Sequence, residues 1–101
     1  MAQALSIEDI RNSVIQVAPL YDVKRVVLFG SYAEGRQTKT SDIDLLVEFP
    51  TFTSYFDVFG MQDELKEKIG KNVDIVPAPI QDDSFLEIKK EITLYEQNET
   101  E

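Results

Sequence analysis

Cysteine and histidine are both absent from this chain of 101 residues. Without cysteine there is no disulfide, no thiolate zinc site and no cysteine nucleophile. Without histidine there is no imidazole general base and no Ser-His dyad. The side chains that remain for metal binding and proton transfer are carboxylates. If the chain is an enzyme, we therefore expect chemistry that uses carboxylates and magnesium.

Long hydrophobic runs are also missing, and basic residues are few. No apolar run is long enough to span a bilayer, and no cationic leader precedes an apolar segment, so we expect a cytoplasmic protein without a membrane partner. The chain has 10 Lys and Arg against 19 Asp and Glu, a formal charge of −9. Because attraction to a phosphate backbone depends on Lys and Arg, we expect no direct contact with nucleic acid, and the acidity suits a basic protein partner.

The length predicts a single domain that is too small for a second ligand-binding lobe. We place this domain at residues 1–95 and expect the polar, acidic residues 96–101 to be a frayed tail. Seven segments carry the periodicity and turn residues of regular structure. In chain order we expect a helix from Ser6 to Pro19, strand 25–29, a short helix within 32–41, strand 42–49, helix 54–69, strand 72–76 and a helix from Ser84 to Tyr95.

Local signals support several of these boundaries. Ser6 with Asp9, and Ser84 with Glu87, have the spacing of capping boxes at the starts of the first and last helices. Pro77 should end the third strand. The order of elements predicts an α/β (α+β) fold, in which a small mixed sheet of three or four strands packs with about four helices.

Residues 30–44 form the most informative pattern. The apolar strand Val26 to Phe29 ends in Gly30-Ser31, whose N–H groups and hydroxyl can hold phosphate oxygens, because glycine permits close approach and a positive φ. After ten intervening residues, Asp42 and Asp44 begin another apolar strand. Residues two apart on a strand share a face, so both carboxylates can bind one hard cation. Taken alone, the Gly-Ser could be a common turn, and the aspartates could cap a loop and face solvent.

This pattern resembles the signature of the DNA polymerase β nucleotidyltransferase superfamily. The short chain is most similar to the minimal nucleotidyltransferase (MNT) family, the antitoxin partners of HEPN-type toxins. The resemblance covers nearly the whole chain and is most specific from Val26 to Glu48. It implies the nucleotidyltransferase fold and transfer of a nucleotide, usually AMP from ATP with magnesium, to an acceptor hydroxyl. Relatives that modify small molecules generally have an additional domain, so the acceptor is expected on a partner.

The resemblance also implies a third carboxylate in the later strand, which here is Asp74. Asp42, Asp44 and Asp74 would then be the metal ligands and catalytic residues for two magnesium ions, with Asp74 as the general base. A lone carboxylate in an otherwise apolar strand is costly to bury, and a metal would offset that cost. Alternatively, Asp74 lies at an exposed strand start.

The predicted nucleotide-binding residues are Gly30, Ser31, Arg36, Lys39 and Ser41. Ser31 would bond the β- or γ-phosphate, and the polar loop 36–41 can lie over the triphosphate. Arg36 and Lys39 would neutralise phosphate charge, although cations on a polar loop are usually only solvated.

Aromatic residues complete the set of candidates. Many relatives place an arginine directly after the Gly-Ser, where this chain has Tyr32, followed by Glu34. Tyr32 could stack on a base, but we favour packing against the first helix. Tyr55, Phe56 and Phe59 are expected to be mostly core, with one exposed patch that forms part of a partner interface.

Together these features predict a magnesium-dependent adenylyltransferase that acts as the antitoxin of a HEPN/MNT pair. It would use ATP to transfer AMP to a tyrosine hydroxyl of the HEPN ribonuclease toxin. Two alternatives stay open. The chain could be a non-catalytic antitoxin that neutralises its partner by binding, or a nucleotidyltransferase subunit that acts on a small molecule or an RNA end.

Overall fold

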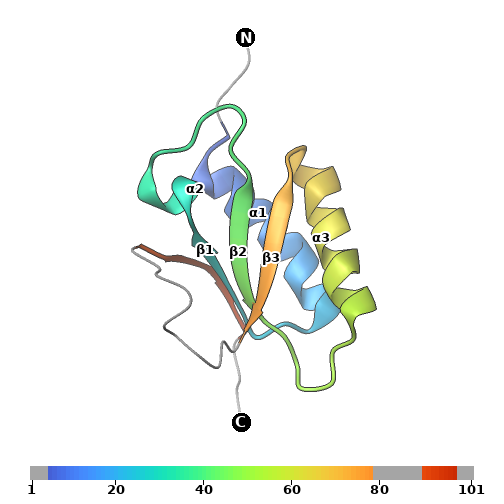
Figure 1. The fold of residues 1–101 in the computed structure, drawn as a ribbon. Coiled ribbons are helices and arrows are strands. Elements are labelled where there is room, and N and C mark those ends of the chain that lie inside the picture. Colours follow the sequence, from blue (N-terminus) through green and yellow to red (C-terminus); the bar gives the residue numbers. More distant parts are fainter. Residues whose placement is uncertain (1–4, 79–89, 98–101) are drawn as a thin grey trace.

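Four strands form one mixed sheet in the computed structural model, which describes residues 5–78 and 90–97 (Figure 1). The elements are α1 (Ile7–Val17), the 3-10 turn η1 (Ala18–Tyr21), β1 (Arg25–Phe29), α2 (Ser31–Glu34), β2 (Ile43–Glu48), α3 (Tyr55–Ile69), β3 (Val73–Ala78) and β4 (Ile92–Glu96). The strand order is β3-β2-β1-β4. Strand β1 is antiparallel to β2 and β4, whereas β2 and β3 are parallel. The predicted fold class is confirmed.

The helix ends follow from the sequence. The Ser6 hydroxyl accepts a hydrogen bond from the Asp9 N–H at 3.0 Å, and the Asp9 carboxylate accepts one from the Ser6 N–H at 3.1 Å, so the predicted capping box of α1 is confirmed. Helix α3 begins after Ser54 and ends at Gly70, which has φ +81°. In the part of the chain that the structure describes, no helix is both long enough and apolar enough to cross a membrane.

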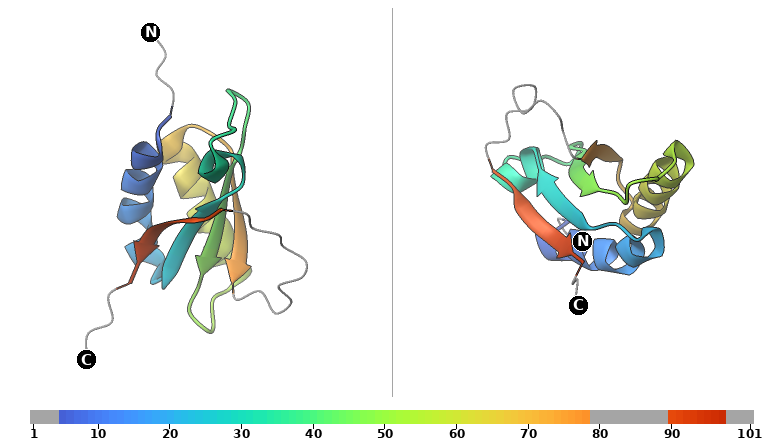
Figure 2. Two further views of the ribbon diagram at one scale, coloured as in Figure 1. Left: turned by 90° about the vertical axis from the view of Figure 1, so that its left-hand side faces the viewer. Right: turned by 90° about the horizontal axis from the view of Figure 1, so that it is seen from below.

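Helices α1 and α3 cover one face of the sheet, and no described helix covers the other, which we call the open face (Figure 2). The core between the helices and the sheet is apolar, and its fully buried members include Ile10, Val14, Val17, Val26, Leu28, Ile43, Leu45, Val47, Met61 and Leu65. Side chains alternate along a strand, so the residues between the core residues of β2 lie on the open face. These are Asp44, Leu46 and Glu48, all partly exposed.

The predicted C-terminal helix is wrong over residues 92–96, which form β4. Leu94 is buried, and Ile92 and Tyr95 pack against the core. Pairing with β1 satisfies backbone groups along a whole strand, and β-branched and aromatic side chains suit that surface, so tertiary pairing outweighs the helical spacing. Ser84 and Glu87 lie outside the described residues.

The start of the expected tail also belongs to the sheet. Glu96 pairs with Arg25, and the Gln97 N–H donates to the Lys24 carbonyl at 2.8 Å. The Gln97 side chain donates to the Asp22 carboxylate, also at 2.8 Å. The sheet therefore extends past the predicted domain end at residue 95, and residues 98–101 lie outside the described part.

Strand β3 continues through Pro77, where the sequence predicted a break. The Ile75 N–H points away from β2 and donates to the Gln62 side chain of α3 at 3.1 Å. Two residues on, the nitrogen of Pro77 has the same outward orientation. Because this nitrogen faces away from β2, the missing N–H of proline removes no hydrogen bond between β2 and β3.

Tyr21 links η1 to α3, and this link gives a test of the packing. Its hydroxyl donates to the Glu64 carboxylate at 2.6 Å, and this hydrogen bond is the main reason that the pKa of Tyr21 is raised to about 12. We expect Tyr21→Phe to lower the free energy of unfolding by about 1 kcal/mol, measured in urea.

The pH dependence of that difference is a second readout. Because folding raises the pKa of Tyr21, its hydrogen bond to Glu64 stabilises the fold fully below the ordinary tyrosine pKa of about 10. This stabilisation is lost as the pH rises through about 12. The difference in stability between Tyr21→Phe and the original chain should therefore shrink across that window. A difference that stays constant to pH 12 would show that the Glu64 hydrogen bond is not its source.

Candidate active site

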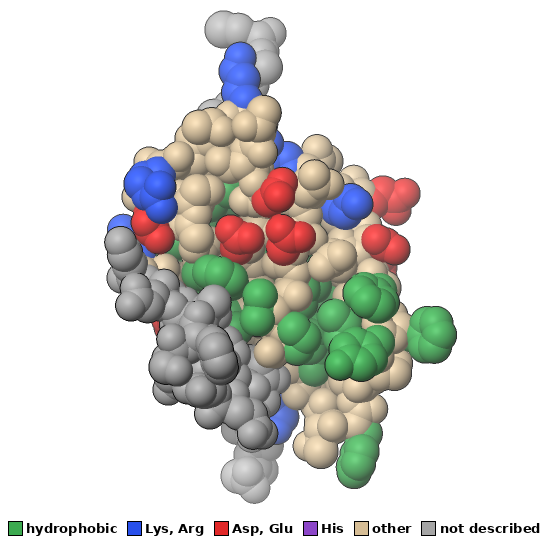
Figure 3. Space-filling view, viewed as in Figure 1, with side chains coloured by type: hydrophobic (Ala, Val, Ile, Leu, Met, Phe, Trp, Pro, Cys, Tyr) green, Lys and Arg blue, Asp and Glu red, His purple; other side chains and the backbone are tan. Residues whose placement is uncertain are grey.

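The open face of the sheet brings the predicted carboxylates together. Asp44 lies beside Asp74 in the parallel register of β2 and β3, and it pairs with Phe29 across β1. Neighbouring strands are about 4.8 Å apart, so the two carboxylates leave adjacent backbones on one face. Asp42 precedes Asp44 by two residues and lies just before β2. Figure 3 shows acidic side chains gathered over this part of the face, above a band of apolar surface.

Asp44 is the most constrained of the three aspartates. It is partly buried, whereas Asp42 and Asp74 are exposed. Burial raises the pKa of Asp44, and the negative charges of Asp74 and then Asp42 raise it further. The three carboxylates therefore repel one another within the fold. A bound cation would relieve that repulsion.

The Gly30 turn lies directly against the Asp44 carboxylate. Gly30 joins β1 to α2 with φ +78° and ψ −155°, a conformation that side chains disfavour. A Cβ atom at this position would collide with the Asp44 carboxylate, whose Cγ would lie 3.1 Å away. Only glycine permits both the backbone conformation and the close approach. The turn and the carboxylates consequently form a single site.

Helix α2 begins at this turn. Ser31 is its first residue and is partly exposed, while the Glu34 N–H donates to the Gly30 carbonyl at 3.0 Å. The N–H groups before Glu34 belong to the first turn, where a helix offers no internal acceptor. Tyr32 is buried in the core and only 3% exposed, so packing, and not base stacking, is its role in this structure.

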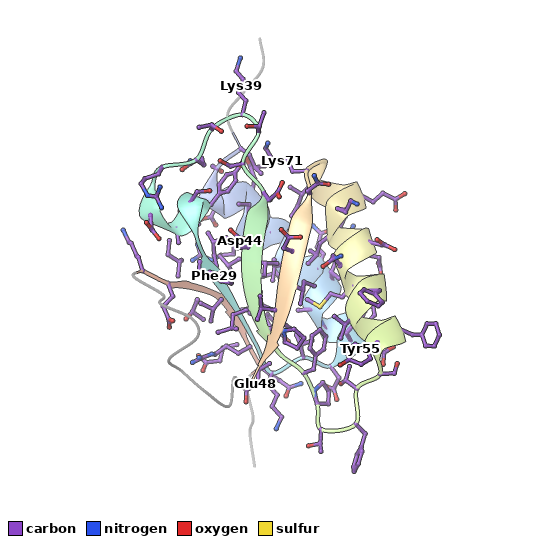
Figure 4. The ribbon with its side chains drawn as sticks, viewed as in Figure 1. Phe29, Lys39, Asp44, Glu48, Tyr55 and Lys71 are labelled. Atoms are coloured by element: carbon purple, nitrogen blue, oxygen red, sulfur yellow. The ribbon has the colours of Figure 1, made fainter. Side chains whose placement is uncertain are left out.

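Two of the loop residues predicted to bind the nucleotide, Arg36 and Ser41, make hydrogen bonds to neighbouring residues in this structure. The Arg36 guanidinium donates to the Glu34 carboxylate at 2.8 and 3.0 Å, so its charge is already paired. The Ser41 hydroxyl accepts the Thr38 N–H at 2.8 Å and closes a turn within the loop. The Lys39 side chain points away from the sheet and from Asp44 (Figure 4). Neither cation pairs with an aspartate of the site in the described residues, and the role of Arg36 and Lys39 at the nucleotide stays a prediction.

Lys71 is a cation that the sequence analysis did not select. Its ammonium donates to the Lys39 carbonyl at 2.6 Å and fastens the loop to the start of β3 (Figure 4). It lines a shallow depression next to the carboxylates, whose lining residues are Lys39, Thr40, Ser41, Asp42, Lys66, Gly70, Lys71 and Asn72. Only the parallel pairing of β2 and β3 brings Lys71 beside this loop, so a pattern in the sequence could not reveal it.

The donor set suits magnesium together with a nucleotide. Within residues 5–78 and 90–97, no group of three or more His, Cys, Asp or Glu side chains is arranged to hold a metal by itself. Magnesium in nucleotide sites is usually bound by one or two carboxylates, with phosphate oxygens and water completing its octahedron. Asp44 and Asp74 can supply those carboxylates from neighbouring strands. The site therefore fits a metal–nucleotide complex better than a protein-only metal cage.

The contact between Gly30 and Asp44 can be tested by a double-mutant cycle. Gly30→Ala should lower the free energy of unfolding by about 1–3 kcal/mol, because it adds backbone strain and a collision with the carboxylate. In an Asp44→Ala background the strain remains but most of the collision is removed, so the same substitution should cost less. Equal costs in both backgrounds, measured in urea, would contradict the close approach.

Comparison with known proteins identifies the family. The family model described as Nucleotidyltransferase domain matches residues 7–97. A Methanocaldococcus jannaschii protein provisionally named protein adenylyltransferase MJ0435 is 42% identical over 72 residues, which cover 71% of this chain and 77% of that protein. Protein adenylyltransferase MntA of Thermococcus cleftensis is 32% identical over 56 residues, 55% of this chain and 57% of that protein.

Solved structures share the fold. A structure provisionally described as a minimal nucleotidyltransferase has a TM-score of 0.65 and 30% identity, with coverage of 75% of this chain and 81% of that one. A toxin–antitoxin structure with AMP-PNP has a TM-score of 0.73 at 21% identity, with coverage of 86% and 73%. With the carboxylates and the glycine turn in the predicted arrangement, these matches show that the chain belongs to the nucleotidyltransferase domain family, as one of its minimal members.

Proposed function

We propose that this nucleotidyltransferase is a protein adenylyltransferase that acts as the antitoxin of a HEPN-type toxin. It would transfer AMP from ATP to a tyrosine hydroxyl of the toxin in the cytosol. The observation that carries the proposal is the pairing of Asp44 with Asp74 on the open face, directly beside the Gly30 turn. The names of the relatives, protein adenylyltransferases, and a neighbouring structure described as a tri-AMPylated HEPN toxin in complex with MNT antitoxin support it.

The nucleotide would bind between the Gly30 turn and the carboxylates. Gly30 allows a phosphate to approach the backbone, and Ser31 contributes a hydroxyl at the start of α2. Lys66 and Lys71 line the same depression as Lys39 and Asp42, so they can neutralise phosphate charge together with Lys39. We therefore propose that these two lysines share the role that the sequence suggested for the loop cations.

The three aspartates would bind the metal, and one of them would also accept a proton. Asp42, Asp44 and Asp74 would hold magnesium, which, when bound, neutralises charge that develops on the phosphate oxygens. Asp74 lies on β3, next to Asp44 and exposed to an incoming acceptor. It would accept the proton of the acceptor hydroxyl as the oxygen bonds to the α-phosphorus. The bond between the α-phosphorus and the bridging oxygen then breaks, and pyrophosphate leaves.

The exposure of the site favours a protein acceptor. Asp42 and Asp74 are exposed, and the described part of the chain forms one layer of helices on one sheet, without a second lobe over the open face. A small acceptor would have few groups to hold it there, and positioning contributes strongly to catalysis. A protein acceptor can be positioned by contacts outside the reacting centre.

One observation favours a second candidate, a non-catalytic antitoxin that neutralises its partner by binding. Tyr32 is buried at the position where many relatives carry an arginine, and Arg36 is paired with Glu34. Fewer cations are therefore available near the Gly30 turn to neutralise phosphate charge than in those relatives. The three aspartates remain in place, and on that ground we favour catalysis.

The two candidates separate in a labelling experiment. The chain would be incubated with ATP labelled at the α-phosphate, magnesium and its co-expressed HEPN-domain partner, and label would be followed on a denaturing gel. We expect label on the partner, reduced by about 100-fold or more in Asp44→Asn, because a ligand and its charge are lost. Glu67→Gln, which makes the same change of charge at an exposed position of α3, should transfer normally.

Stability measurements show whether Asp44→Asn simply unfolds the protein. Because folding raises the pKa of Asp44, the ionised carboxylate destabilises the folded state at pH values above its pKa. Asp44→Asn removes this charge, so the variant should be at least as stable as the original chain at pH 7. Full labelling by Asp44→Asn would contradict the proposed site. A stable complex without label in the original chain would instead support the binding antitoxin.

A further inference from the structure

Four large aromatic side chains are exposed at one end of the molecule. The exposed fractions are 97% for Phe52, 75% for Tyr55, 87% for Phe56 and 58% for Phe59. Tyr55 and Phe59 stack with ring centroids 6.4 Å apart. We call these four residues the aromatic patch. Apolar groups gathered in this way on a small domain mark an interaction surface.

The patch is separate from the core of the domain. Helix α3 already buries Val58, Met61 and Leu65 against the sheet. At 3.6 residues per turn, the ring of Phe56 is opposite these buried residues, and the rings of Tyr55 and Phe59 lie between the two sides of the helix. All three are at exposed positions, which surface helices usually give to polar residues. These three rings therefore add little to the packing of the domain, and their exposure points to a partner.

At least part of the patch, Tyr55, lies on the same side of the molecule as the carboxylates. In Figure 3 the apolar groups over α3 and the acidic group over the sheet face the viewer together. Strand β2 runs from Asp44 toward Glu48, a step of four residues or about 13 Å, and Figure 4 shows Glu48 and Tyr55 near its far end. A depression continues from the strand to Tyr55, the ring of the patch that lines it together with Lys24, Glu48, Phe49, Pro50, Thr51, Thr53, Val58 and Pro77.

This distance selects the kind of occupant. A single tyrosine side chain bound at Asp44 is shorter than this distance and would not also reach Tyr55. A folded protein that presents a hydroxyl at Asp44 would cover both. The surface between them is continuous along β2 and the depression at Tyr55. The patch is thus placed to bind the surface of an acceptor protein while the carboxylates contact the side chain of that protein that reacts.

Charge indicates the chemistry of that protein. Asp57 is in the first turn of α3 and Asp63 follows Phe59 by one turn, whereas the cations Lys66 and Lys68 are in the last turn. The rings therefore lie in the acidic half of the helix, on a chain of net charge −9. A complementary surface would be an apolar groove bordered by Lys and Arg.

We propose that the aromatic patch is the docking surface for the protein that receives AMP, through an apolar groove with a basic rim. This inference rests on the proposed function, since it names how the acceptor is held at the same site. Docking on Phe56 and Phe59 sets the affinity for the acceptor, and the carboxylates set the rate of transfer.

The test compares Phe56→Ser/Phe59→Ser with Leu20→Ser, a matched control because Leu20 is also exposed, at 68%, but lies in η1 outside the patch. With the co-expressed HEPN-domain protein as acceptor, the patch variant should raise the KM for that protein about tenfold or more, with kcat and the affinity for magnesium-ATP unchanged. Leu20→Ser should leave all three values unchanged. An unchanged KM in the patch variant would overturn the proposal.

A binding measurement without ATP separates this inference from the proposed function. Asp44→Asn should keep its affinity for the HEPN-domain protein and the patch variant should lose it, even if the original chain transfers no AMP. Light scattering addresses a second copy of this chain as occupant. If the original chain is a dimer that the patch variant converts to monomers, and affinity for the HEPN-domain protein is unchanged, the docking assignment is wrong.

Discussion

The close approach of the Gly30 backbone to the Asp44 carboxylate is the constraint on which the site depends. Antiparallel pairing of β1 and β2 puts Phe29 opposite Asp44, so the turn that follows Phe29 must pass beside that carboxylate. Only a residue without a side chain fits there. The turn proposed to bind phosphate and the carboxylate proposed to bind metal therefore become neighbours through strand pairing alone. Parallel pairing of β2 with β3 then adds Asp74 to the same face.

Stability and chemistry are separated on the two faces of the sheet. The face covered by α1 and α3 is wholly apolar, and none of the buried side chains in the described residues is polar or charged. The open face carries three carboxylates that repel one another and raise the pKa of Asp44. Proteins commonly accept such a local cost at a functional site because the rest of the fold compensates for it. Here the compensation comes from the opposite face of the same strands.

Much of the site could be predicted because it depends on local spacing. The capping box at Ser6, the strand before Gly30 and the two-residue spacing of Asp42 and Asp44 are all encoded within short stretches. Asp74 needed the family resemblance, because its proximity to Asp44 arises from the parallel register of β3 and not from its neighbours in sequence. Lys71 was missed for the same reason.

The errors came from tertiary pairing. Residues 92–96 fit a helical spacing in the sequence, but the free edge of β1 makes them a strand. Pro77 was read as a break, yet its nitrogen faces away from β2. In both cases a contact between segments decided between conformations that the sequence allowed. The role of Arg36 over the triphosphate stays a prediction, and its guanidinium pairs with Glu34 in this structure.

The central claim is that Asp44 and Asp74, on neighbouring strands, jointly hold a metal–nucleotide complex. Electron paramagnetic resonance of Mn²⁺, added with a non-hydrolysable ATP analogue, measures this binding without any acceptor or turnover. We predict weak Mn²⁺ binding without the analogue, tighter binding with it, and a loss of about tenfold or more in both Asp44→Asn and Asp74→Asn. Binding that Asp74→Asn leaves unchanged, or tight binding of Mn²⁺ without nucleotide, would contradict the account.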